Sequence, residues 1–326
     1  MIFILFGVSI IAFTVTHVVP SSPEAMWAGP HAKKEDLEKA REELRLNEPI
    51  YIQYYAYIKE LLQGNFGTSI RTRQPVAHQL SIFWTATFEL VTIAFVLALL
   101  LGISLGILSA IYRNSLLDHV VRILSLTGVS IPIFWLGLLL QIFFFDRLGW
   151  LPLQGRISSE MLLAHPIQRI TGLYLVDSLL TGNWIAFLDS FKHIILPAIT
   201  LSYAALAMVT RQTRSSVLEV LGEHYIRTAK AYGLPPRIIL FKNTLKNAMI
   251  PVLTVAGLSY GYDLGGAFLV EAIFNWPGLG RYGVESIITY DFPAIMGVVL
   301  VFSAVYIIVN LIVDIIYAFL DPRIRF

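Results

Sequence analysis

The sequence predicts an all-α integral membrane protein, because its charge content, its hydropathy and the length of its apolar stretches all exclude a soluble domain. Of 326 residues, 56% are hydrophobic and only 14% are charged, whereas a soluble domain carries roughly 25% charged residues. The mean hydropathy is +0.69. So few charges cannot cover a chain of this size with a polar surface.

We expect six membrane-spanning helices, because six apolar stretches are long enough to cross a hydrocarbon layer of ~30 Å at ~1.5 Å per residue. The first has no basic leader region and no small-residue cleavage site before Pro20, so we expect a retained helix rather than a signal peptide. The six stretches are Met1–Val19, Leu90–Ile111, Ile123–Phe145, Ile194–Thr210, Ala248–Val270 and Ala294–Leu320.

A seventh stretch, Ile170–Phe191, is fairly apolar, but Asp177, Asn183 and Asp189 interrupt it. We expect it to lie outside the lipid, as an interfacial or partly re-entrant segment. A seventh span would also reverse the orientation that the loop charges predict.

The basic residues of the short loops predict that both termini are cytoplasmic. Residues 211–247 carry seven basic and two acidic residues, a net charge of +5. On the opposite side, residues 271–291 carry one basic and three acidic residues, a net charge of −2. Basic loops stay in the cytoplasm, so residues 211–247 are expected there.

We divide the chain into residues 1–89, a first transmembrane helix with an extracytoplasmic helical loop, and residues 90–326, a five-helix core with a cytoplasmic loop at about 211–248. Within the outer loop, the spacing of apolar residues predicts helices at Lys33–Leu46 and Ile50–Gln63. We expect two solvated helices that cap the outer face. A docking surface for an external partner is a special case of the same arrangement.

Small residues recur every four positions on two of the expected spans. In lipid, helix association depends on close van der Waals fit, so such stripes predict closely packed helices. Pro132 and Pro197 predict kinks in two other spans. These features suit a transporter that moves between two shapes, and they also suit a static bundle. The small residues are Ala98, Gly102, Gly106 and Ala110 on the second span and Gly257, Gly261 and Gly265 on the fifth.

Motifs for catalysis, metals and nucleotides are weak or missing. Residues 102–106 (GISLG) match the G-x-S-x-G nucleophile pattern, but that pattern needs a strand–turn–helix context, and Ser104 lies in the middle of a predicted span. An intramembrane serine hydrolase, the distant alternative, would need a histidine on a neighbouring span, and His17 is the one histidine within a span. The sequence has no cysteine, no P-loop and no metal-ligand spacing, so ATP would have to be hydrolysed by another polypeptide.

Three acidic residues lie in or at the edges of spans, where a carboxylate must be paired or hydrated. Glu89 and Asp314 lie near span ends, so we expect structural roles for both. Asp263 lies in mid-span, two residues after Gly261. For Asp263, a position on a transport path and a satisfied structural hydrogen bond both stay open.

The cytoplasmic loop contains a short predicted helix, Glu223–Tyr232, of about ten residues and ~15 Å. Gly233, Pro235 and Pro236 follow it, the pattern of a helix end. Ala229 and Ala231 are small, so we expect them to leave the backbone accessible to a partner. A surface helix that only joins two spans is the alternative.

The same loop carries a resemblance to a known family. Tyr225–Leu234 (YIRTAKAYGL), followed by Lys246–Pro251 (KNAMIP), resembles the cytoplasmic loop of the permeases of binding-protein-dependent ABC importers. Within these, the chain resembles the first permease of the dipeptide/oligopeptide/nickel subfamily. Further motifs of that group are Leu61–Pro75 (LLQGNFGTSIRTRQP), Ser130–Leu140 (SIPIFWLGLLL), Leu148–Gly155 (LGWLPLQG), Leu196–Ala198, Trp276–Arg281 (WPGLGR) and Asp321–Arg325 (DPRIR).

The resemblance implies the type I ABC importer transmembrane fold in the cytoplasmic membrane of a prokaryote. It implies four partners: a homologous second permease, two ATPase subunits that bind ATP and Mg, and an extracytoplasmic solute-binding protein. No cofactor or metal is expected on this chain, and the net charge of +2 gives no reason to expect nucleic acid. The implied cargo is a peptide, with oligosaccharides or nickel chelates as alternatives.

The resemblance also implies that the short cytoplasmic helix couples the permease to its ATPase. The implied coupling residues are Glu223, Tyr225, Arg227, Thr228, Ala229, Lys230, Ala231, Tyr232, Gly233 and Leu234. The chain departs from the general pattern of importers in several places. Arg227-Thr228-Ala229 stands where Glu-Ala-Ala is general and Leu245-Lys246 where Leu-Pro is general, and both changes are usual in the peptide subfamily. Ser21-Ser22-Pro23 replaces Gly-Asp-Pro, and Asp263 replaces an uncharged residue.

Overall fold

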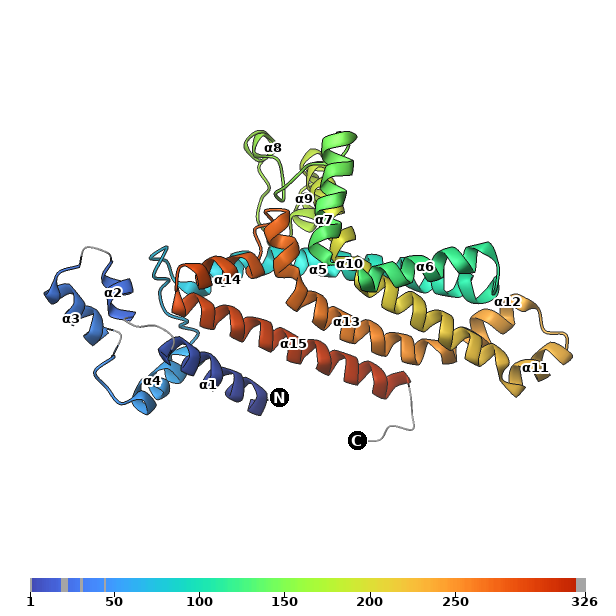
Figure 1. Cartoon of the computed structure of the whole chain (residues 1–326), viewed down its shortest axis with the longest axis horizontal. Coiled ribbons are helices and arrows are strands. Elements are labelled where there is room, and N and C mark those ends of the chain that lie inside the picture. Colours follow the sequence, from blue (N-terminus) through green and yellow to red (C-terminus); the bar gives the residue numbers. More distant parts are fainter. Residues whose placement is uncertain (1, 19–22, 30–31, 44, 321–326) are drawn as a thin grey trace. The chain divides into compact units, whose positions relative to one another are not determined.

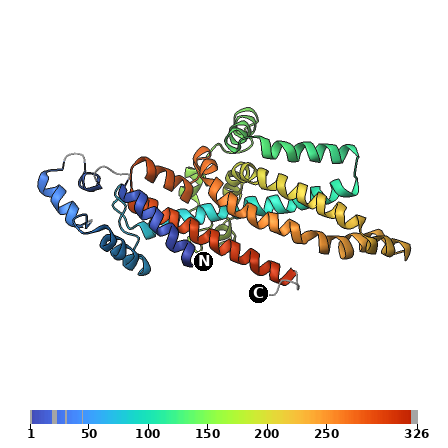
Figure 2. The ribbon, with the colours of Figure 1, turned by 60° about the horizontal axis from the view of Figure 1, so that its bottom comes forward.

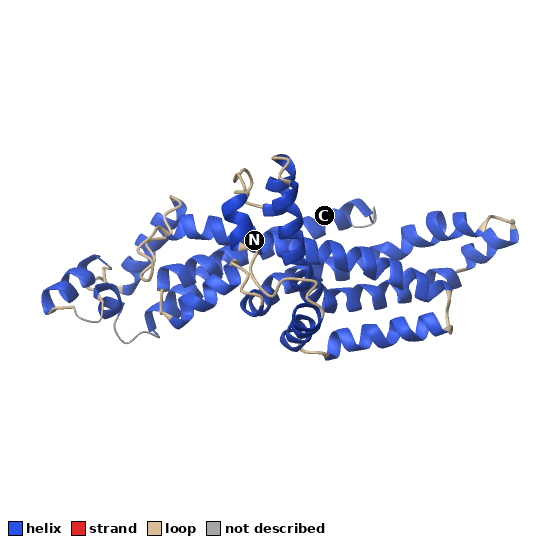
Figure 3. Cartoon of the chain, turned by 90° about the horizontal axis from the view of Figure 1, so that it is seen from above, coloured by secondary structure: helices blue, strands red, loops and turns tan. Residues whose placement is uncertain are grey.

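The computed structural model describes residues 2–18, 23–29, 32–43 and 45–320, and within these ranges all regular elements are helices (Figure 3). An isolated β-bridge between Thr68 and Pro75 closes a loop. The predicted all-α class is therefore confirmed. Figure 1 labels the elements: α1 (Ile2–Val18), α2 (Pro23–Ala28), α3 (Lys34–Glu43), α4 (Ile50–Leu62), α5 (Val76–Ile111), α6 (Leu116–Ser130), α7 (Ile133–Gln141), η1 (Ile142–Arg147), α8 (Ser159–Ala164), α9 (Tyr174–Leu180), α10 (Trp184–Gly222), α11 (His224–Ala231), α12 (Pro236–Ile238), η2 (Ile239–Thr244), α13 (Leu245–Ile273), α14 (Leu279–Ile288) and α15 (Phe292–Leu320).

These elements form two compact units. The first comprises Met1–Ala86 and Pro277–Ile307, and the second comprises Thr87–Trp276 and Ile308–Phe326. The long helices α5 and α15 each contribute residues to both units.

Four helices of the described residues are long and apolar enough to cross a membrane: Val76–Ile111, Trp184–Gly222, Pro236–Ile273 and Phe292–Val313. They cover four of the six predicted spans. The first predicted span forms α1, whose apolar stretch of Phe3–Thr14 is shorter than a full crossing. A fifth span is reached only if the bent pair of α6 and α7 is counted as one.

The third predicted span, Ile123–Phe145, is divided in two at the proline that predicted a kink. The helix stops between Ser130 and Ile133, and the helices on either side are bent by 110° relative to each other; both are labelled in Figure 1. Pro132 has no N–H to donate, and the residue before a proline is pushed out of the helical region. Ile131 is accordingly extended, with ψ 125°. At Pro197, the other proline expected to kink a span, α10 continues without a break.

The segment Ile170–Phe191 contains α9 and the first turns of α10, joined through Gly182 at φ +67°. Asp177, on α9, organises the loop before it. Its carboxylate accepts backbone N–H groups of Ile170, Thr171 and Gly172 at 3.2, 2.8 and 2.9 Å. Burial alone would raise the pKa of Asp177, but these hydrogen bonds and that of the Thr171 hydroxyl outweigh it and lower the pKa. Asp177, one of the acidic residues that interrupt the apolar segment, therefore has a structural role: it holds the loop that precedes α9.

In the second unit, α5 and α10 approach each other at glycines. A Cβ placed on Gly102 would lie 2.9 Å from Val209 Cγ1, and one placed on Gly106 would lie 2.5 Å from Thr213 Cβ and 2.7 Å from the Thr210 carbonyl oxygen. Ala98, one turn before Gly102, is fully buried. Gly257 of α13 meets Val313 of α15 in the same way, at 2.3 Å.

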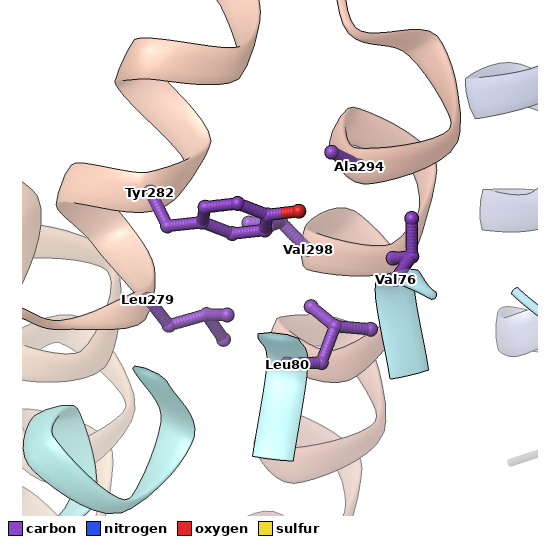
Figure 4. Packing of buried hydrophobic residues seen from close by; sticks show 6 residues of the cluster. All are labelled: Val76, Leu80, Leu279, Tyr282, Ala294 and Val298. Atoms are coloured by element: carbon purple, nitrogen blue, oxygen red, sulfur yellow. The ribbon is translucent and has the colours of Figure 1, made fainter. Parts of the chain in front are cut away.

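The first unit is centred on a cluster of Val76, Leu80, Leu279, Tyr282, Ala294 and Val298 (Figure 4). The ring of Tyr282 stacks on Phe83 with centroids 4.7 Å apart. The segment Leu61–Pro75 is also fixed within this unit. The Asp291 carboxylate accepts hydrogen bonds from the backbone N–H of Ile70, at 3.0 Å, and from the Ser69 hydroxyl. Position 297 must be small, since a Cβ would lie 2.9 Å from both Val76 and Leu80.

The outer-loop helices α3 and α4 lie close to their predicted ranges. α4 is more than a solvated cap, because Tyr54 bonds the Ser9 hydroxyl of α1 at 2.8 Å and packs edge-on against Phe13 with ring centroids 5.2 Å apart. Tyr57 packs against the same Phe13 ring. Figure 2 shows α1 in a second view of this unit.

Replacing Gly106 by Ala tests the close contact of α5 and α10. We expect G106A to destabilise the protein by about 1–3 kcal/mol, since the added methyl group overpacks the contact against Thr213 and backbone. The midpoint of thermal unfolding of purified protein measures this. G266A is the matched control, because a Cβ at Gly266 meets nothing within 4 Å. Equal stability of the two variants would contradict the contact.

Candidate functional site

The candidate coupling surface lies on the loop that joins α10 to α13. Helix α10 ends at Gly222, and α11 follows after Glu223, whose extended backbone (φ −66°, ψ 149°) turns the chain. The predicted helix over Glu223–Tyr232 is therefore present, with α11 at His224–Ala231. The loop continues through Pro235, α12 and η2 into α13.

Gly233 ends α11 in a Schellman motif. Its N–H donates to the carbonyl oxygen of Lys230 at 3.0 Å, and the N–H of Leu234 donates to that of Ala229 at 3.2 Å. Gly233 has φ +75°, a conformation that glycine adopts without steric cost. The pattern of Gly followed by Pro thus marked the helix end at the correct residue.

One face of α11 is anchored to the rest of the loop. Ile226 is fully buried, and with Ala229 and Ile239 it forms a cluster that packs against Val220 and Leu221. Ala229, one of the two small residues expected to leave the backbone accessible to a partner, therefore packs on the anchoring face. Ala231 is exposed.

The opposite face of α11 is free of other parts of this chain. Arg227, Thr228 and Lys230 are exposed, and within the described residues neither basic group forms an ion pair. Tyr232, just after the helix, is 83% exposed, and Phe241 of η2 is 66% exposed. Exposed apolar rings beside unpaired cations are typical of a surface that binds another protein.

A π-helix, η2, connects this surface to α13. Such segments are rare and are frequently found at functional sites. The Thr244 hydroxyl donates to the Ile239 carbonyl oxygen at 3.0 Å, and the Tyr225 hydroxyl of α11 accepts from the Asn247 side chain of α13 at 2.8 Å. Direct contacts therefore link α11 to the start of α13.

The predicted path residues of α13 differ in how far they are buried. Asp263 and Gly261 are buried, whereas Gly265 is exposed and a Cβ there would meet nothing within 4 Å. Asp263 is 7% exposed, and its Oδ2 has no hydrogen-bond partner among the described residues. One of the two expectations for Asp263 was a structural role with its hydrogen bonds satisfied. For Oδ2, the structure shows no such hydrogen bond within the described residues.

Other polar side chains of α13 make contacts with α5. Glu271 accepts from the Thr87 hydroxyl at 2.5 Å, and the hydroxyls of Tyr260 and Thr92 lie 3.3 Å apart. Polar groups inside spans cost free energy unless they are paired or face water. Asp263 is the member of this group that keeps an unpaired oxygen.

The serine expected for the hydrolase alternative lies in the middle of α5, an uninterrupted helix. Ser104 is exposed, and no strand–turn–helix surrounds it. The side chains of His17 and Asp314 lie outside those that the structure describes. Across the described ranges, no group of three or more His, Cys, Asp or Glu residues could hold a metal ion.

The sequence did not reveal a buried ion pair between Arg156 and Glu89. The Arg156 Nε lies 2.9 Å from Glu89 Oε2, and its guanidinium lies 3.8 Å from the Tyr174 ring centroid and 5.9 Å from that of Trp276. The other Glu89 oxygen accepts the Leu175 N–H at 2.8 Å. An acidic residue at the edge of a span, Glu89, was the one sign of this ion pair in the sequence. Its structural role agrees with the expectation. Its partner could not be predicted, because it lies 67 residues away in the chain.

Two family descriptions match the chain over nearly its whole length. Residues 102–326 match the "binding-protein-dependent transport system inner membrane component", and residues 1–87 match the N-terminal region of the same class of membrane component. The chain belongs to this family. It is a multi-pass membrane component of a bacterial binding-protein-dependent transport system, so it is a permease and not an enzyme.

Among curated relatives of this permease, a probable D,D-dipeptide transport system permease protein of Escherichia coli (strain K12) is 47% identical over 324 residues, covering 99% of this chain and 94% of the relative. A dipeptide transport system permease protein of Alkalihalophilus pseudofirmus is 42% identical, covering 99% and 96%. A glutathione transport system permease protein of Salmonella choleraesuis is 38% identical, covering 98% and 94%.

A solved structure of the MetNI methionine ABC transporter in an inward-facing conformation has a similar fold. The TM-score is 0.52 at 17% identity, covering 74% of this permease and 96% of that chain. At this identity the likeness concerns the fold alone.

Breaking the buried ion pair should destabilise the permease strongly. We expect R156M to cost about 3–5 kcal/mol, because it leaves the Glu89 carboxylate buried without its counter-charge. Thermal unfolding of purified protein measures the loss. E285Q is the matched control: Glu285 pairs with Arg71 at 3.2 Å, but both side chains are about one-third exposed, so we expect a loss below about 1 kcal/mol. Similar losses in both variants would contradict the assigned role.

Proposed function

We propose that this permease forms half of the translocation path of an ATP-driven importer of dipeptides. Its partners are a homologous second permease, two ATPase subunits that bind ATP and Mg, and an extracytoplasmic solute-binding protein. The full-length relatives named as dipeptide permeases support the cargo. One observation supports the coupling role: the loop helix α11 is anchored on one face and exposed on the other.

In this proposal α11 is the coupling helix. Arg227, Thr228, Lys230, Ala231 and Tyr232 meet the ATPase, while Ala229 fixes the helix to the permease. Glu223, Tyr225, Gly233 and Leu234 set the orientation of α11 through its ends. Closure of the ATPase on ATP would then shift α11, η2 and α13 together, a rigid-body switch between two states.

The proposed topology has six membrane helices with both termini in the cytoplasm. α1 and the bent pair of α6 and α7 supply the two crossings beyond the four long helices, and the net charge of +5 on residues 211–247 supports the orientation. The division into residues 1–89 and 90–326 stays a prediction. The chain itself is proposed to bind no cofactor.

Oligosaccharides or nickel chelates are the alternative cargo. The permease sequence favours neither, since specificity in such systems rests chiefly with the solute-binding protein. Calorimetry on the solute-binding protein that works with this permease, with dipeptides, oligosaccharides and nickel chelates as ligands, decides between them. Dipeptide binding supports the proposal, and binding of a sugar alone contradicts it.

Replacing Gly233 tests the coupling role. Valine at φ +75° is strained by ~1–2 kcal/mol, so we expect G233V to shift α11 and reduce substrate-stimulated ATP hydrolysis of the reconstituted complex by about tenfold, the equivalent of ~1.4 kcal/mol. G233N is the matched control, since asparagine tolerates this conformation and should retain most of the coupling. Unchanged stimulation in correctly assembled G233V would contradict the proposal.

Asp263 is proposed to line the substrate path when the transporter changes state, because its unpaired oxygen needs a partner in at least one state. We expect D263N to reduce uptake of dipeptides with a cationic side chain by about tenfold, while uptake of neutral dipeptides changes little, since the amide keeps the shape and loses the charge. Uptake by proteoliposomes measures both. Equal effects on all dipeptides would rule out this role.

A further inference from the structure

A buried carboxylate between α5, α6 and α10 has no part in the coupling surface described above. Asp118, in the first turn of α6, is fully buried. It accepts hydrogen bonds from the Arg214 guanidinium of α10, at 2.7 and 2.9 Å, and from the Ser109 hydroxyl of α5, at 2.5 Å. The Asn114 N–H, in the turn between α5 and α6, donates a further bond at 3.0 Å. One carboxylate thus joins three helices and a turn.

The geometry of the ion pair fixes how α6 lies on α10. Nε of Arg214 bonds one oxygen of Asp118, and a second guanidinium nitrogen bonds the other oxygen. Such a paired contact sets direction as well as distance. The Arg214 side chain is only 22% exposed, and a buried carboxylate that loses its counter-charge is strongly destabilised. The contact therefore resists separation of the two helices.

Beyond the ion pair, α6 stays in contact with α10 (Figure 1). A Cβ placed on Gly128 would lie 2.6 Å from Ala207 Cβ, so the two backbones approach closely there. The hydroxyls of Thr127 and Tyr203 lie 2.7 Å apart. These contacts are about ten residues, or ~15 Å, from Asp118 along α6. α6 is thus attached to α10 near both of its ends.

The ion pair also lies close to the loop that carries α11. Arg214 precedes the end of α10 at Gly222 by eight residues, roughly 12 Å along the helix. Between them, Val217 forms a buried cluster with Ala110 of α5 and Ala248 of α13. The ion pair therefore adds α6 to a packed group of α5, α10 and α13 directly beside the proposed coupling helix.

We propose that Asp118 and Arg214 are positioning residues for coupling: their ion pair makes α6 move together with α10 when the ATPase displaces α11. This inference rests on the proposed coupling role of α11. Neither residue contacts the ATPase or the cargo in this scheme. The pair acts by holding the start of α6 at a fixed distance and direction from α10, so that a displacement of the loop reaches α6 as well.

Replacing Arg214 separates this role from a general contribution to stability. The measurement is the number of dipeptides taken up per ATP hydrolysed by the assembled complex in proteoliposomes. Loss of folded permease lowers the amount of complex, whereas a positioning role changes this ratio. We expect R214M to lower the ratio several-fold. R211M is the matched control and should keep it, because Arg211 is exposed on the same helix and forms no ion pair within the described residues.

A covalent link in place of the ion pair gives a second test. The sequence contains no cysteine, so D118C/R214C introduces the only two thiols of the permease. We expect this variant to be uncoupled like R214M, and a short bifunctional thiol reagent that joins the two positions to restore the ratio of uptake to hydrolysis. The same reagent on the complex with the unaltered permease controls for reaction with the partner subunits.

A normal ratio in correctly assembled R214M would overturn the proposal. So would a link that does not restore the ratio in D118C/R214C, or that stops uptake, because α6 and α10 would then have to separate during transport. G233V distinguishes these failures from failure of the coupling role. If G233V keeps normal substrate-stimulated ATP hydrolysis, the coupling surface itself is wrong. If G233V is uncoupled and R214M is not, only the role of the ion pair fails.

Discussion

Close approach of helices through glycine is the constraint on which the second unit depends. Lipid offers no hydrophobic reward for bringing two helices together, so their association rests on van der Waals fit. At Gly102 and Gly106 the backbone of α5 comes so near α10 that a single methyl group has no room. α10 in turn makes its most extensive contact with α13, which places the loop between them, with α11, at the end of a rigid pair.

The packing of this pair bears on the proposed coupling role of the loop between α10 and α13. Ile226 and Ala229 hold α11 against Ile239 and the end of α10, while Arg227, Lys230 and Tyr232 stay exposed. The proposed coupling needs a helix that is fixed to the permease on one face and accessible to the ATPase on the other. The π-helix η2 and the Tyr225–Asn247 hydrogen bond extend this connection into α13, where Asp263 keeps an unpaired oxygen.

In the second unit, buried charged groups hold the loops near α9. A desolvated ion pair between Arg156 and Glu89, covered by the rings of Tyr174 and Trp276, fixes a loop to α5, and Asp177 caps the loop that leads into α9. In the first unit, aromatic contacts of α4 with α1 and an apolar core around Tyr282 act beside a buried carboxylate, Asp291, which holds the loop at Ser69 and Ile70. In both units, buried carboxylates thus hold loops in place.

The sequence by itself determined the all-α membrane class, four long spans, the end of α11 at Gly233 and the family, because composition, apolar length and the Gly–Pro ending are local properties of the chain. Pro132 likewise predicted a bend in the third span, and the structure gave its size, 110°. Only the tertiary structure decided that Ala229 packs inward and that Arg156 meets Glu89. Both depend on which segments lie side by side. Hydropathy and helical spacing report how one segment prefers to fold, and they carry no information about the neighbour against which it packs.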